Sequence, residues 1–343
     1  MAVSLPDRVD PRALLRLLVD GEARSGVRLA SALGTNRGEV VRLVRRLRAA
    51  GIDIVAGGGR GYRLPAPVEL LDAGRIGGAM REEMRRAIHR LEVLFDVDST
   101  STRLLELPPP PPGCANVCSS ELQHAGRGRR GRPWVSPFGG SLALSLGWSF
   151  AGAAAVNPTL SLAVGVAISR ALERLGAKRV RLKWPNDIWL GDRKIGGVLV
   201  ELRTEAAGPA HVVIGIGLNV SLSAEQRRII EAGDVRNASV RIAAVSDACP
   251  EKVSRNVLAA TLLEELLSML GEFERSGFAV FREEWLALDA LAGRSSRVLV
   301  GDGSVEGTAR GVDRDGALLL EVAGRLERHV SGEVSLRLIE GDT

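Results

Sequence analysis

The sequence is poor in cysteine and has no long uninterrupted apolar segment. Its three cysteines, Cys114, Cys118 and Cys249, are odd in number and lack C-x-x-C spacing, which argues against a disulfide framework and against a structural zinc site. The apolar stretch over residues 141–168 is broken by glycine, asparagine and proline, and the N-terminus lacks the order of a signal peptide. We therefore expect a cytoplasmic protein with no membrane span.

Acidic residues are scarce relative to arginine at the N-terminal end of the chain. Residues 1–65 contain 12 arginines and 6 acidic residues, whereas the other 278 residues contain 34 basic and 35 acidic ones. A basic segment on a neutral body predicts a polyanionic partner for that segment. The length of 343 residues also exceeds what one hydrophobic core usually supports, so we expect two or three domains.

The basic segment has the pattern of three helices followed by a hairpin. The predicted elements are helices over 14–19 and 26–33, a third, arginine-rich helix capped by Asn36, and β-like runs over 52–55 and 62–64. This order is typical of a winged helix-turn-helix DNA-binding domain, which we place at residues 1–65. A small helical interaction domain with solvated arginines is the alternative. The side chains expected to contact DNA are Asn36, Arg37, Arg42, Arg45, Arg46 and Arg60.

After a proline-marked linker, signals for strands and helices alternate. Strands are predicted over 115–122, 142–148, 180–184, 187–190, 195–202 and 212–220, and helices from Thr100 and over 157–175 and 253–273. Two strand pairs are hairpin-spaced, so the sheet must be mixed or antiparallel. From residue 296 five short strands separated by turns indicate a small β-barrel. We expect an α+β protein with a central domain over 66–290 and a C-terminal barrel over 291–343.

The segment QHAGRGRRGRPW contains Gly126, Gly128 and Gly131 at the G-x-G-x-x-G spacing of a dinucleotide-binding turn. Such a turn opens a helix, but Pro133 and the residues after it do not permit one here. The segment also carries Arg127, Arg129, Arg130 and Arg132, and no acidic residue occurs between 122 and 172. It is expected to fold over a multiply anionic ligand, with guanidinium groups on phosphate or carboxylate oxygens. A solvated basic loop is the alternative.

A second motif, KWPNDIWLGDRKIGG at 183–197, places Lys183, Asn186, Asp187 and Lys194 on one predicted hairpin. Two cations, an amide and a carboxylate so close together suit the binding of a charged substrate. An ordinary turn with two core tryptophans is the structural alternative. The strand that ends in GIGLN, 215–219, has glycines where a backbone would approach a ligand closely.

These segments together resemble a known family. The stretches DSTS at 98–101, QHAGRGRRGRPWVSPFGGSL at 123–142, KWPNDIWL at 183–190, RKIGGVLVEL at 193–202 and GIGLNV at 215–220 occur in the order and spacing of the bacterial biotin protein ligases. The predicted winged helix and barrel complete the length of the bifunctional members, which also repress biotin-synthesis genes. The resemblance implies a catalytic domain with the fold shared by biotin ligases and class II aminoacyl-tRNA synthetases, followed by an SH3-like barrel.

The resemblance also implies an activity. Family members couple biotin to ATP, with Mg²⁺ assisting, to form biotinyl-5′-AMP, and then transfer biotin to a lysine of the biotin carboxyl carrier protein of acetyl-CoA carboxylase. No residue is assigned to a protein-bound metal site. A single winged helix reads only a short half-site, so we expect the adenylate to promote a homodimer that binds operator DNA.

Carried over position by position, the resemblance implies roles for individual residues. Biotin binding is expected of Ser99, Thr100, Gln123, Gly126, Arg127, Arg129, Trp134, Lys194, Gly197, Leu199 and Gly215. Binding of ATP and the adenylate is expected of Arg127, Arg129, Arg130, Arg132, Lys183, Asn186, Lys194 and Asn219. The catalytic side chains are expected to be Arg129, Lys194, Asp187 and Lys183, with Asp187 orienting the incoming lysine.

Two features depart from the family pattern. Some relatives cover the adenine with a tryptophan, but residues 221–250 contain no aromatic side chain, and Val235 or Val240 is the candidate replacement. The proline run 108–112 matches no motif. Two other functions stay open: a ligase that loads lipoate by the same adenylating chemistry, and a repressor that senses biotin without catalysis.

Overall fold

The computed structural model describes residues 9–57, 61–150, 159–203, 210–233, 241–300, 303–330 and 332–336. The chain forms two compact units, the first made of residues 1–71 with 137–139 and the second of the remaining residues. Within the described ranges, no helix is both long and apolar enough to cross a bilayer.

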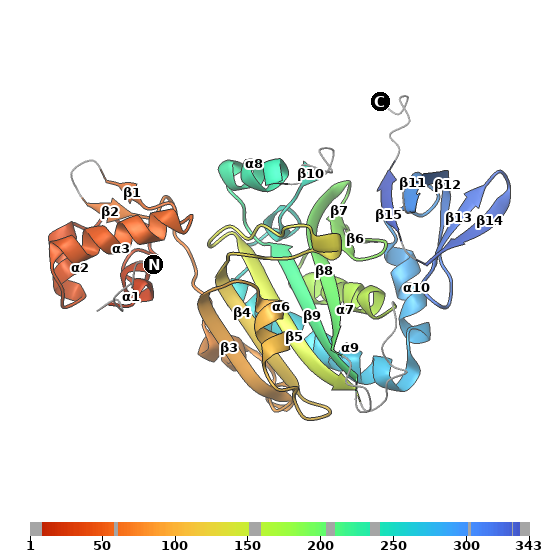
Figure 1. The fold of residues 1–343 in the computed structure, drawn as a ribbon, viewed down its shortest axis with the longest axis horizontal. Coiled ribbons are helices and arrows are strands. Elements are labelled where there is room, and N and C mark those ends of the chain that lie inside the picture. Colours follow the sequence, from red (N-terminus) through yellow and green to blue (C-terminus); the bar gives the residue numbers. More distant parts are fainter. Residues whose placement is uncertain are drawn as a thin grey trace. The chain divides into compact units, whose positions relative to one another are not determined.

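The first unit consists of three short helices and a two-stranded hairpin (Figure 1). Each helix begins after a polar side chain, Asp10, Ser25 or Asn36, that accepts a hydrogen bond from an amide of the first turn. These caps satisfy amide groups that have no partner within the helix. The elements are α1 (Pro11–Arg16), α2 (Gly26–Ala32), α3 (Arg37–Ala49), β1 (Val55–Ala56) and β2 (Tyr62–Arg63). The three predicted helices and the hairpin are therefore present, with the first helix three residues earlier than predicted and the strands shorter.

Helix α3 has one buried and one exposed side. Its buried residues are Val40, Leu43, Val44 and Leu47. Its exposed residues include Arg37, Arg42, Arg45 and Arg46, which were predicted to contact DNA. Asn36 is also exposed, but its Oδ1 is occupied as the helix cap by the amide of Glu39, at 2.9 Å. Arg60 lies outside the described residues.

The second unit is built on a mixed sheet with strand order β3-β4-β5-β9-β8-β7-β6, and a short strand, β10, pairs with β8 (Figure 1). The β3–β4 and β10–β8 pairs are parallel and the other pairs are antiparallel. The bounds are β3 (Ile88–Val97), β4 (Ala115–Gln123), β5 (Ser141–Phe150), β6 (Val180–Lys183), β7 (Asp187–Leu190), β8 (Arg193–Arg203), β9 (Ala210–Asn219) and β10 (Arg241–Ile242). Hairpin spacing predicted a mixed or antiparallel sheet, and the sheet is mixed.

Helices cover both faces of this sheet. Helix α6 (Thr100–Glu106) packs against β4, β5 and β9 on one face, and α7 (Leu160–Arg174) and α9 (Arg255–Ser276) pack together on the opposite face (Figure 1). The remaining helices of this unit are α4 (Ala73–Ala79), α5 (Glu82–Arg85), α8 (Ala224–Gly233) and α10 (Ala279–Leu288). The face that carries α6 is the face on which the predicted ligand-binding segments meet.

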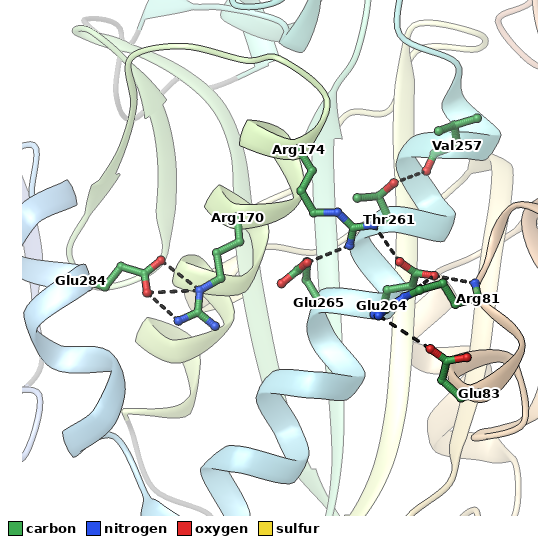
Figure 2. Close-up of polar contacts among 9 residues, drawn as sticks. All are labelled: Arg81, Glu83, Arg170, Arg174, Val257, Thr261, Glu264, Glu265 and Glu284. Carbon is green, nitrogen blue, oxygen red and sulfur yellow. Dashed lines mark hydrogen bonds and ion pairs between the residues drawn. The ribbon is translucent and has the colours of Figure 1, made fainter.

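On the opposite face, ion pairs join the helices to one another (Figure 2). The Arg174 guanidinium of α7 donates to Glu264 and Glu265 of α9, at 2.8 and 2.7 Å. Burial alone would raise the pKa of the Glu264 carboxyl, but hydrogen bonds from the Arg81 amide and from Arg174 outweigh it and hold this pKa below its ordinary value. Arg170 of α7 pairs with Glu284 of α10. This network supports the sheet from behind and lies away from the predicted ligand-binding residues.

The C-terminal strands form a five-stranded antiparallel sheet with the order β14-β13-β12-β11-β15. Their bounds are β11 (Ser295–Val300), β12 (Gly303–Val312), β13 (Leu318–Val322), β14 (Arg325–His329) and β15 (Glu333–Leu336), so the five predicted strands are confirmed. This sheet contacts the central one through Trp184, whose Nε1 donates to the Gly316 carbonyl at 3.0 Å. Gly332, just before β15, also lies close to Trp184, because a Cβ added there would be 3.8 Å from the Trp184 ring.

The chain enters the C-terminal sheet through a buried acidic residue, Asp289. Its side chain accepts a hydrogen bond from the Leu291 amide at 2.9 Å, but Oδ2 has no partner among the described residues. Burial raises the pKa of Asp289 to about 6. Ionisation of this carboxyl therefore opposes folding. The penalty is absent below its unfolded pKa near pH 4 and is complete above about pH 6.

Asp289→Asn is therefore expected to increase the free energy of unfolding at pH 7 by about 2–3 kcal/mol, because a pKa unit corresponds to about 1.4 kcal/mol. The gain should vanish near pH 4. Urea denaturation at the two pH values measures it. Asp313→Asn is the control and should instead lower the free energy of unfolding at pH 7. Hydrogen bonds from Arg328 and from backbone amides outweigh the effect of burial on Asp313 and lower its pKa, so its ionised form stabilises the fold. An equal stability change in Asp289→Asn at both pH values would contradict the assignment.

Candidate active site

A cavity of about 450 Å³ lies where the predicted ligand-binding segments converge. Its wall is formed by the start of α6, the end of β4 with the loop 127–135, the β6–β7 turn, the middle of β8 and the end of β9. The predicted residues that line it are Ser99, Thr100, Gln123, Arg127, Arg129, Arg130, Arg132, Trp134, Lys183, Asn186, Asp187, Lys194, Gly197, Leu199, Gly215 and Asn219. Gly126 does not line the cavity.

Gly126 instead joins the start of the arginine-rich loop to its end. Its carbonyl accepts from the Trp134 amide at 2.8 Å, and an added Cβ at this position would lie 2.5 Å from the Trp134 carbonyl oxygen. The two ends of the arginine-rich loop are therefore held together by backbone contacts that only glycine permits. Between them, Arg130 has a left-handed backbone with φ of 55°, which is uncommon for a residue with a side chain.

Hydroxyl and amide groups form one part of the cavity wall. Ser99 caps α6, and Gln123 Oε1 accepts from the Thr100 amide at 3.0 Å and from its hydroxyl at 3.2 Å. The Thr100 hydroxyl also lies 2.7 Å from that of Ser145, which in turn lies 3.0 Å from that of Ser101. Ser145 was not predicted. Its signal is a serine at the middle of a fully buried strand, β5, between Leu144 and Leu146.

Two glycines of β9 make room for the groups packed against the strand. A Cβ at Gly215 would lie 2.6 Å from Ser101 Oγ, and one at Gly217 would lie 2.3 Å from the Trp134 ring. The Trp134 ring therefore packs directly on the β9 backbone. This explains why glycine is required in GIGLN, and it gives the cavity an apolar wall beside the hydroxyl groups.

The cationic side chains approach the cavity from two segments. Lys194 Nζ lies 2.7 Å from Asp187 Oδ1, and Arg129 Nη1 lies 3.4 Å from Asn186 Oδ1. Lys183 is buried, and its ammonium group lies 4.3 Å from the centre of the Trp189 ring, where the cation and the ring attract each other. Several cations at one cavity favour an anionic ligand, because phosphate or carboxylate oxygens can accept hydrogen bonds from them and offset their charge.

The arginine-rich loop is not without acidic partners, although none occurs near it in the sequence. Arg127 pairs with Glu201 of β8, at 3.0 Å. Although residues 122–172 contain no acidic side chain, at least one arginine of the loop is therefore paired with a carboxylate. Strand β8 supplies this carboxylate from more than 70 residues away in the chain.

The part of the cavity around Asn219 is lined by aliphatic residues. Asn219 is buried and donates to the Ala243 carbonyl at 3.1 Å, and its Oδ1 has no partner within the described residues. Ile230, Glu231 and Ile242 from α8 and β10 also line the cavity, and none was predicted. Val235 and Val240, the candidates for covering the adenine, lie outside the described residues.

Comparisons with known proteins bear on these features. Residues 94–219 match the biotin/lipoate A/B protein ligase family, and residues 293–337 match the biotin protein ligase C-terminal domain. The bifunctional ligase/repressor BirA of Escherichia coli is 37% identical over 340 residues, which cover 98% of this chain and 100% of that protein. This chain belongs to the biotin protein ligase family. A further family member, the biotin–[acetyl-CoA-carboxylase] ligase of Paracoccus denitrificans, is 33% identical over 68% of this chain and 95% of that protein.

Solved structures of the biotin protein ligase family agree with the fold. The Aquifex aeolicus enzyme in complex with biotin and ATP superposes with a TM-score of 0.60 at 27% identity, and the match covers 73% of this chain and 99% of that one. The expected biotin-ligase fold of the central sheet is therefore confirmed.

Proposed function

We propose that this protein is an ATP-dependent biotin protein ligase. It forms biotinyl-5′-AMP and pyrophosphate, and then transfers biotin to a lysine of the biotin carboxyl carrier protein of acetyl-CoA carboxylase, in the cytoplasm. The observation that carries the proposal is a single cavity whose wall combines hydroxyl and amide groups, an apolar tryptophan face and the cations Arg127, Arg129, Lys183 and Lys194. A ligand with a polar neutral head, an apolar middle and an anionic end fits such a wall.

The neutral ureido ring of biotin needs both donors and acceptors. Ser99, Thr100 and Gln123 supply them, and the hydrogen bond of Gln123 with Thr100 fixes the orientation of the amide before the ligand arrives. Gly215 keeps the β9 backbone close to this group, and the Trp134 ring contributes apolar surface for the fused rings and the aliphatic chain.

In the first step, an oxygen of the biotin carboxylate attacks the α-phosphorus of ATP, and the bond from that phosphorus to pyrophosphate breaks. Two anions must approach each other, so cations at the reacting atoms lower the barrier. Arg129 and Lys194 are the side chains for this role, and Lys183 and Asn186 would hold the outgoing phosphates. Mg²⁺ would neutralise phosphate charge. Among the described residues of the wall, Asp187 and Glu231 have the carboxylates that suit this cation.

In the second step, the amine of the carrier lysine attacks the carbonyl carbon of the adenylate, an amide forms and AMP leaves. The amine must first lose a proton and point at the carbonyl. Asp187 lies at the cavity wall and is held by Lys194 at 2.7 Å, so its carboxylate is positioned to orient the incoming ammonium group.

The first unit supports a second function, repression of biotin-synthesis genes. Three capped helices with a hairpin, and four arginines on the exposed side of α3, fit a winged helix-turn-helix at residues 1–65 that binds operator DNA. The catalytic domain would extend over 66–290, and the C-terminal sheet would form an SH3-like barrel over 291–343.

Biotinyl-5′-AMP is expected to promote a homodimer. Beyond Val198, whose amide and carbonyl are hydrogen-bonded to Asn186, the β8 edge facing β7 has no ladder partner among the described residues, so the backbone groups there are available to a second copy. Ordering of the neighbouring arginine-rich loop by the adenylate would favour this pairing by about 1–3 kcal/mol. Sedimentation at micromolar concentration, with and without adenylate, measures the dimer fraction. Equal fractions in both samples would remove the basis for ligand-controlled repression.

Two alternatives are separated from the proposal by one experiment. Labelled biotin, with ATP, is incubated with the protein and a biotin carboxyl carrier domain, and a parallel reaction contains lipoate and a lipoyl domain. Label on the biotin carrier supports the proposal. Transfer of lipoate alone would identify a lipoate ligase, and binding of biotin with no transfer would identify a repressor that only senses it. The intact set of Lys183, Asn186, Asp187 and Lys194 at the cavity favours catalysis.

A further inference from the structure

The Arg127 side chain is held by two groups that lie outside the cavity. Its Nη2 donates to Thr102 Oγ1 at 3.1 Å and to the two carboxylate oxygens of Glu201 at 3.0 and 3.3 Å. Thr102 is on α6 and Glu201 is on β8, so this one nitrogen joins the arginine-rich loop to two separate elements. Arg127 lines the cavity, whereas Thr102 and Glu201 do not.

The other side-chain nitrogens of Arg127, Nε and Nη1, have no hydrogen-bond partner within the described ranges. They can donate to a ligand while Nη2 keeps its two anchors. Lys194 differs in this respect, because its partner Asp187 is itself part of the cavity wall and competes with a ligand for the ammonium group. The carboxylate of Glu201 is separated from the cavity by the guanidinium that it holds.

We propose that Glu201, together with Thr102, is a positioning residue that fixes Arg127 to receive the carboxylate of biotin. This inference rests on the proposed ligase function. An arginine that is already ordered loses less conformational entropy when it binds a ligand, which strengthens association. The negative charge of Glu201 would by itself weaken the binding of an anion. Its position outside the cavity, behind the guanidinium, makes the anchoring effect the larger of the two.

The test is the dissociation constant of biotin, measured by calorimetry with the full-length protein and its variants. Glu201→Ala is expected to weaken biotin binding about fivefold, the factor typical of ordering one long side chain. Thr102→Val, which removes only the second anchor, should give a smaller loss. Glu92→Ala is the matched control: Glu92, on β3, pairs with Arg103 of α6 at 3.1 Å and does not line the cavity. It should change biotin binding less than about twofold.

A neutral ligand separates positioning from a general structural effect. Biotinol has an alcohol in place of the carboxylate, so it gains little from an ordered Arg127, and Glu201→Ala should bind it as the wild type does. Equal losses for biotin and biotinol would overturn the inference, as would unchanged or tighter binding of biotin by Glu201→Ala. If the wild-type protein bound no biotin, the proposed function itself would fail.

Discussion

Replacing Lys194 by alanine is expected to slow formation of biotinyl-5′-AMP by about 10²–10³-fold in kcat, with a much smaller change in the KM for biotin. The negative charge on the oxygens around the α-phosphorus increases in the transition state, so a cation placed there stabilises the transition state more than the bound substrates. Lys194 is held in the cavity wall by Asp187 at 2.7 Å and is partly shielded from water, which increases the effect of its charge.

Single-turnover formation of adenylate from labelled ATP measures this step without the carrier. Lys178→Ala removes an exposed lysine that does not line the cavity and should leave the rate unchanged. Arg129→Gly is expected to act differently from Lys194→Ala. Loss of the Arg129 side chain should loosen the loop over the ligand, so that the adenylate is released faster. A rate reduction below about tenfold in Lys194→Ala would show that this ammonium group is not required in the transition state.

Most of the candidate site could be predicted from the sequence because its residues occur in short motifs. Two successive hairpins, β6–β7 and β7–β8, bring Lys183, Asn186 and Asp187 next to Lys194 by strand pairing alone, so local spacing was enough to bring them together. The glycines of β9 were recognised in the same way, since a strand that needs glycine for close packing shows it in its sequence.

The groups that support these motifs could not be predicted, because they come from distant parts of the chain. Glu201 reaches the arginine-rich loop from β8, and Ser145 reaches α6 from β5, and neither contact follows from local spacing. The wall formed by Ile230 and Ile242 belongs to α8 and to a two-residue strand, β10, and no local motif links either element to the cavity.

Strand β3 was not predicted from the sequence. It is one of the two edge strands of the sheet, and most of its side chains are only partly buried, so its residues do not alternate between apolar and polar types. The strands buried on both sides, such as β5, were predicted correctly because their apolar runs are bounded by glycine, proline or polar residues. Burial, more than secondary structure itself, determines which elements the sequence reveals.

Deletion of residues 1–65 is expected to abolish operator binding, and binding by the full-length protein should fall steeply with salt. Four of the exposed arginines of α3, Arg37, Arg42, Arg45 and Arg46, are placed to neutralise phosphates, and a dimer on a two-fold site would use each of them twice. About eight phosphate contacts predict a loss of roughly 10⁴-fold in affinity between about 50 and 200 mM salt.

Titration of a labelled promoter duplex from biotin-synthesis genes, with biotinyl-5′-AMP present, measures this slope. In Arg45→Ala/Arg46→Ala the slope of log affinity against log salt should decrease by about 4, because each dimer loses four phosphate contacts. Arg16→Ala is the control, since it removes one positive charge per protomer from an exposed position on α1, outside α3, and should leave the slope unchanged. Binding that is insensitive to salt, or that survives the deletion, would place the DNA-binding surface elsewhere. Ligase activity of the double variant should stay at the wild-type level, because Arg45 and Arg46 do not line the cavity of the second unit.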